Sequence, residues 1–109
     1  MGDTKNPELS PEEEIQARIL GETAKIPWKE LQRFFAQGVA ILVHPDLDLV
    51  EAAFQITEDN EQQVKSWMES GQLRPVSDDQ AREWLEANAL VWAVVVRPWV
   101  LVQPILQQH

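Results

Sequence analysis

Apolar residues recur at helical spacing through much of the chain, and local signals mark where the helices begin. Ser10 is a suitable N-cap, Pro11 fits the first helical position, and Glu13 stands where a capping box places a glutamate. A second helix is predicted from Pro27, and Gly38 would end it. Its inward face would carry four large apolar side chains, those of Trp28, Leu31, Phe34 and Phe35.

Three later helices follow from the same kind of pattern. The first begins after the turn-like residues 44–46. The second would begin at Asn60 and end at Gly71, and the third would begin at Ser77, with Gln80 in the capping-box position. The inward face of the second would hold Val64, Trp67 and Met68.

Runs of β-branched residues predict strands. Residues 39–43 form a short continuous apolar run, which is typical of a strand covered on both faces. Residues 91–96 and 99–102 predict buried strand as well, either one strand bent at the proline between them or two short strands. Residues 73–76 predict one more short strand, in which Pro75 suits an edge or a strand end.

This order of elements predicts an α+β domain with a small sheet of three or four strands and helices mainly on one face. The alternative is an α/β fold with parallel pairing, since helices separate the strands. Residues 10–109 would form this single domain, and the polar residues 1–9 would form a flexible N-terminal arm.

Charge and composition narrow the classes of partner. The chain of 109 residues has 18 acidic and 9 basic residues, a formal charge of -9 that repels nucleic-acid phosphates and anionic lipid. It has no cysteine, which fits a reducing compartment, and no apolar segment of the kind found in secretory signals. We therefore expect a cytoplasmic protein that binds neither nucleic acid nor membranes.

Four separated segments carry a family resemblance. They are residues 22–36 (ETAKIPWKELQRFFA), residues 46–51 (DLDLVE), the Glu58-Asp59 pair leading to Trp67, and residues 92–103 (WAVVVRPWVLVQ). In this order they resemble the bacterial family catalogued as domain of unknown function 2288. The resemblance implies a small bacterial, cytoplasmic protein. It brings no catalytic residue, cofactor or partner that can be transferred to positions of this chain.

One predicted strand end delivers an imidazole and several carboxylates to a single corner. His44, Asp46 and Asp48 lie within five residues, and Glu51 follows one helical turn later. Oxygen-rich ligands of this kind suit Mg²⁺ or Mn²⁺, so a divalent metal is the one cofactor that the sequence suggests. The favoured interpretation is structural: Asp46 or Asp48 caps the following helix, and Glu51 completes a capping box with Asp48.

A short basic strip stands out on this acidic chain. Lys29 and Arg33 share one face of the second predicted helix beside Trp28, and together the three residues are candidates for binding an acidic partner segment. The alternative is a solvated helix face whose cations pair with Glu22 and Glu30. Among the five tryptophans, Trp28 and Trp99 are the ones expected to be partly exposed, each beside a proline.

No nucleophile elbow, phosphate-binding loop or zinc-type spacing occurs in the chain, which argues against an enzyme without excluding one. The sequence therefore favours a binding or regulatory module that acts through a protein partner. A homodimer is a further possibility, if residues 91–102 form an exposed sheet edge. The alternative function is a small metal-assisted enzyme centred on His44, Asp46, Asp48 and Glu51.

Overall fold

The computed structural model describes residues 9–105, so most of the predicted N-terminal arm lies outside the described residues. The helices are α1 (Pro11–Glu22), the 3₁₀ helix η1 (Trp28–Leu31), α2 (Gln32–Ala36), α3 (Leu49–Thr57), α4 (Glu61–Ser70) and α5 (Asp78–Glu86). The strands are β1 (Ala24–Pro27), β2 (Ala40–Val43), β3 (Leu73–Pro75), β4 (Leu90–Val96) and β5 (Trp99–Pro104). No helix among residues 9–105 has the length and apolar character needed to cross a membrane.

The strands form one mixed sheet in the order β1-β4-β5-β2-β3. β2 runs parallel to β5, whereas the other neighbouring strands are antiparallel. The α+β class is thus confirmed, with five strands in place of the three or four expected. The additional strand is β1, which the sequence did not reveal.

Pro27 ends β1 instead of starting a helix. The strand pairs with β4 through Ala24↔Ala93 to Pro27↔Leu90, and the Trp28 N–H continues this ladder by donating to Ala89 O at 2.9 Å. A proline is tolerated here because β1 lies at the edge of the sheet, where one side of the backbone needs no strand partner. The helical segment therefore starts one residue later, as η1.

β4 and β5 form an antiparallel hairpin in the middle of the sheet. Val96 pairs with Trp99, and the cis peptide between Arg97 and Pro98 lies in the turn. Of the two arrangements left open by the sequence, the structure has two strands. Because β4 and β5 are both central, residues 91–102 do not form the exposed sheet edge on which the possible homodimer depended. The sheet edges are β1 and β3, and Pro75 lies at the end of edge strand β3, as predicted.

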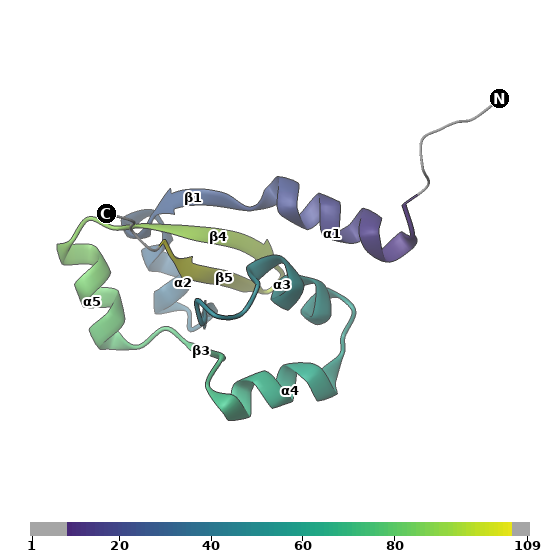
Figure 1. The fold of residues 1–109 in the computed structure, drawn as a ribbon. Helices are drawn as coiled ribbons and strands as arrows, with labels where there is room; N and C mark the ends of the chain where they lie inside the picture. Colours follow the sequence, from purple (N-terminus) through teal and green to yellow (C-terminus); the bar gives the residue numbers. More distant parts are fainter. Residues whose placement is uncertain (1–8, 106–109) are drawn as a thin grey trace.

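Helices cover both faces of the sheet, so the expectation that they lie mainly on one face is wrong. Residues of β4 alternate between two apolar clusters, with Val91 and Ala93 in one and Trp92 and Val94 in the other. The first cluster packs against η1, α2 and α5, and the second packs against α1, α3 and α4. Figure 1 shows α3 between α1 and α4, with α2 and α5 toward the opposite end of the sheet.

Local caps fix where most helices begin. Ser10 and Glu13 exchange both bonds of the predicted capping box, at 3.1 and 3.0 Å. The predicted cap of α4 is also confirmed, because Asn60 Oδ1 accepts from the Gln63 N–H at 3.2 Å. At the other end of α4, Gly71 adopts a left-handed φ of 84°, as a C-terminal stop requires.

Candidate functional site

An apolar groove with a volume of about 400 Å³ lies between α4 and the β3 edge of the sheet. We call it the α4 groove. Its apolar lining consists of Ile41, Ile56, Val64, Met68, Leu73, Pro75 and Trp99. Its remaining lining residues are Gly38, Asp59, Asn60, Glu61 and Arg74. The groove therefore has an apolar interior and a few polar groups, the combination found in many ligand-binding sites.

α4 is held beside the sheet by side-chain packing and by a backbone hydrogen bond at its C-terminal end. Its Trp67 side chain packs against the cluster that contains α3 and Leu73, while Val64 and Met68, four residues apart, line the groove. After Gly71, the Gln72 N–H donates to Trp67 O at 2.8 Å, which turns the chain directly into β3. The spacing between α4 and the sheet is thus set by packing and by backbone hydrogen bonds.

Two large apolar side chains of the groove reach solvent. Met68 is 57% exposed and Trp99 is 37% exposed. The partial exposure of Trp99 was predicted, whereas Met68 was expected to face inward with Val64 and Trp67. That expectation is wrong because Val64 and Trp67 pack against the apolar cluster of α3 and Leu73, whereas Met68 lies outside that cluster.

Carboxylates lie at the mouth of the groove, where α3 turns into α4. Asp59 has a φ of 59° and follows the C-cap of α3. The hydrogen bonds Asp59 N–H to Ile56 O and Asn60 N–H to Gln55 O, both 3.0 Å, complete a Schellman motif. Glycine or asparagine is usual at this left-handed position after a helix. Asp59 therefore places a carboxylate at a position that is uncharged in most helices. Glu61 stands two residues further on.

The four metal candidates are used mainly for local structure. His44 Nδ1 accepts from the Asp46 N–H at 3.0 Å, and Asp48 Oδ1 caps α3 by accepting from the Glu51 N–H at 3.0 Å. Glu51 was predicted to complete a capping box with Asp48, and this prediction is wrong. Its carboxylate instead accepts hydrogen bonds from the side-chain amides of Gln16 at 3.2 Å and Gln55 at 2.7 Å. Within residues 9–105, no three His, Cys, Asp or Glu residues are grouped so that they could hold a metal ion.

The predicted basic strip is only partly a surface feature. Trp28 is fully buried at 0% exposure, with its ring centroid 5.1 Å from that of Trp84, so the expectation of partial exposure is wrong. Burial of the indole is favoured because it fills the space between the sheet and α5. Lys29 and Arg33 are exposed. In the described part of the chain neither forms the ion pair expected with Glu22 or Glu30, and the Arg33 guanidinium lies 5.0 Å from the Phe34 ring centroid.

Comparison with known proteins gives two findings. The model of a family described as "Protein of unknown function (DUF2288)" matches residues 14–104. The chain is also similar to a solved structure titled "NMR solution structure of PA1075 from Pseudomonas Aeruginosa", with 40% sequence identity and a TM-score of 0.76. That match covers 99% of this chain and 97% of the other. No curated protein matches the chain.

Proposed function

This chain belongs to the DUF2288 family of proteins of unknown function, and we propose that it is a non-enzymatic binding module that holds a protein partner in the α4 groove. The observation that carries the proposal is the exposure of Trp99 and Met68 beside an apolar cavity. Contiguous exposed apolar surface commonly marks an interaction site on a folded domain.

The chemistry of the lining supports a partner that inserts bulky apolar side chains. Tryptophan supplies a large buried area to an interface and is enriched among residues that dominate binding energy. Methionine is flexible and polarisable, which lets a groove adapt its shape to the partner. Ile41 and Leu73 form a fixed apolar floor, because they belong to the hydrogen-bonded strands β2 and β3.

The other predicted function receives less support. A metal-assisted enzyme at the His44 corner would need side chains that converge on one point, whereas Asp48 and Glu51 are occupied by the α3 cap and by glutamine contacts. The strip of Lys29 and Arg33 keeps its charges but lacks the exposed tryptophan that would have anchored a partner.

We further propose that the protein binds this partner in the bacterial cytoplasm.

Site-specific photo-crosslinking in bacteria that express the protein tests the proposal. A photoreactive phenylalanine analogue is placed at position 68, and in a matched control at position 85, where Leu85 is 49% exposed on α5 outside the groove. A discrete protein adduct is expected at position 68 but not at position 85. It should disappear when Trp99→Ala is added and persist with the charge reversals Lys29→Glu and Arg33→Glu.

Two results would contradict the proposal. One is the absence of an adduct at position 68 in a protein that is folded and expressed at the normal level. The other is an adduct that forms equally at both positions, because this would indicate unspecific contact with surrounding proteins.

A further inference from the structure

We infer that the segment held in the α4 groove is basic: bulky apolar residues flanked by lysine or arginine that face Asp59 and Glu61. This inference rests on the proposed function and adds the chemical class of the partner. It is carried by the placement of two carboxylates, neither of them ion-paired within residues 9–105, at the mouth of an apolar cavity.

The two carboxylates are held in place by backbone structure. Asp59 occupies the left-handed position of the Schellman motif, and the Glu61 N–H donates to Asp59 O at 3.0 Å. The intervening Asn60 has its amide engaged, because its Oδ1 accepts from the Gln63 N–H and its Nδ2 donates to Gln55 Oε1. The turn therefore presents both acidic groups from a fixed backbone.

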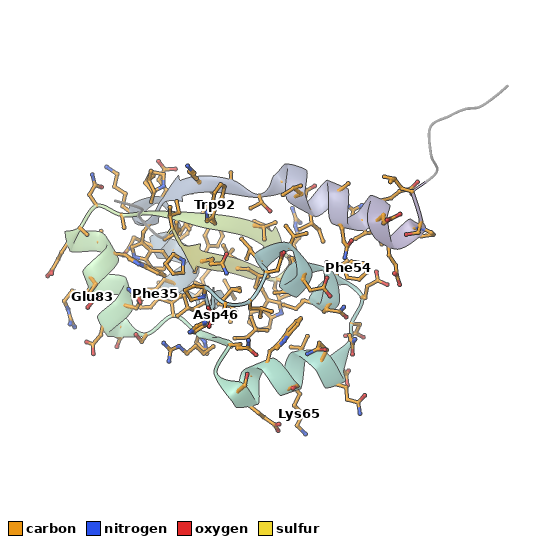
Figure 2. The ribbon with its side chains drawn as sticks, viewed as in Figure 1. Phe35, Asp46, Phe54, Lys65, Glu83 and Trp92 are labelled. Carbon is orange, nitrogen blue, oxygen red and sulfur yellow. The ribbon has the colours of Figure 1, made fainter. Side chains whose placement is uncertain are left out.

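Neither carboxylate is paired with a cation in the part of the chain that the structure describes. Within residues 9–105, Asp59 and Glu61 form no ion pair, whereas Asp79 on α5 lies 3.0 Å from Arg82. Lys65, the lysine of α4, points away from the sheet in Figure 2. A cation brought by a partner would thus find two carboxylates that form no ion pair within residues 9–105.

Arg74 is the single cation among the described lining residues, so two carboxylates face one guanidinium. Arg74 belongs to β3, whereas Asp59 lies in the α3–α4 turn and Glu61 is the first residue of α4. The attraction for a cation is therefore centred on the turn. The formal charge of -9 on the whole chain adds a long-range attraction for basic segments and slows the approach of acidic ones.

Each carboxylate is expected to contribute modestly to the affinity for a basic segment. Exposed ion pairs contribute about 1.5- to 5-fold in affinity, and added salt weakens them. Two such pairs at the groove mouth should contribute about 2- to 25-fold together. The apolar anchors would supply most of the remaining affinity, and the carboxylates would select among segments with similar anchors.

Selection from a random peptide library displayed on phage tests the inference with the whole chain as bait. Peptides that bind the wild type but not the uncharged groove variant Met68→Ser are expected to share one or two bulky apolar residues next to Lys or Arg. Binding of these synthetic peptides is then measured by fluorescence anisotropy. The double variant Asp59→Asn/Glu61→Gln should weaken it about 2- to 25-fold. Asparagine at position 59 retains the tolerance for positive φ.

A matched control separates local from overall charge. Glu83→Gln/Glu86→Gln removes the same charge from α5, where Figure 2 shows Glu83 on the outer side, and should change affinity less than 2-fold. Groove-dependent peptides with neutral or acidic flanks, or an equal loss in both double variants, would overturn the basic-segment inference and leave the proposed function standing. Failure to recover any peptide that depends on Met68 would contradict the proposed function itself.

Discussion

The side-chain amide of Gln103 in β5 donates a hydrogen bond to the carbonyl oxygen of Leu47 at 2.7 Å, across 56 positions of the sequence. The same nitrogen also donates to His44 O at 2.9 Å. Both acceptors lie in the segment between β2 and α3, which carries Asp48, the N-cap of α3. One side chain therefore fastens this segment to the middle of the sheet.

Gln103→Ala is expected to lower the free energy of unfolding by about 1–3 kcal/mol, because the carbonyls of Leu47 and His44 both lose the Gln103 donor and the His44 carbonyl keeps only the Leu47 N–H. Urea denaturation measures the change. The matched control is Gln62→Ala on α4, which replaces an exposed glutamine and should cost less than about 0.5 kcal/mol. Equal stability of the two variants would show that the hydrogen bonds of Gln103 contribute nothing measurable.

Asp48 stabilises α3 as its N-cap, so Asp48→Ala should cost about 1 kcal/mol, whereas Asp48→Ser should retain most of the stability. Thermal and urea unfolding give both values. Measurement with and without millimolar Mn²⁺ addresses the metal hypothesis at the same residue. Stabilisation of the wild type by Mn²⁺ that is lost in Asp48→Ser would revive that hypothesis.

Trp28 fills the core on one face of the sheet, but its indole nitrogen has no hydrogen-bond partner among the described residues. Because the buried side chain is large, Trp28→Ala should leave a cavity and lower the free energy of unfolding by about 3–5 kcal/mol. Trp28→Phe keeps the aromatic contacts with Phe35 and Trp84 and removes the unpaired donor, so we expect a loss of about 1–2 kcal/mol. Equilibrium denaturation that ranks the two variants equally would contradict this account.

Replacement of glycine by alanine should change the free energy of unfolding in opposite directions at Gly71 and Gly21. Gly71→Ala places a Cβ at a φ of 84°, which costs about 1 kcal/mol, whereas Gly21→Ala in α1 removes chain entropy from the unfolded state and should stabilise by about 0.5 kcal/mol. A Cβ at either position meets no atom within 4 Å, so backbone conformation alone separates the two cases. If chemical denaturation showed that both variants are stabilised, or that both are destabilised, this explanation from backbone conformation would be refuted.

The candidate site was only partly predictable from the sequence. The exposure of Trp99 was expected from its position beside Pro98, but the α4 groove as a whole was not. Its lining comes from strands and helices between Gly38 and Trp99, and each segment taken alone has the composition of an ordinary core element. Only the packing of α4 against the β3 edge leaves Val64 and Met68 beside Pro75 without a further layer above them.

The amino-acid sequence by itself determined the features that depend on neighbours within about four residues. The Ser10 and Asn60 caps, the Gly71 stop and the extended segments predicted at 39–43, 91–96 and 99–102 follow from local hydrogen bonding, backbone freedom and β-branched side chains.

Tertiary structure decided whatever depends on distant partners. β1 exists because β4 pairs with its four residues, and Trp28 is buried because α5 closes over it. Helices cover both faces because residues of the central strands alternate between two apolar clusters, each of which must be removed from water. Burial depends on which helices and strands pack against one another, and a local sequence pattern does not specify this packing.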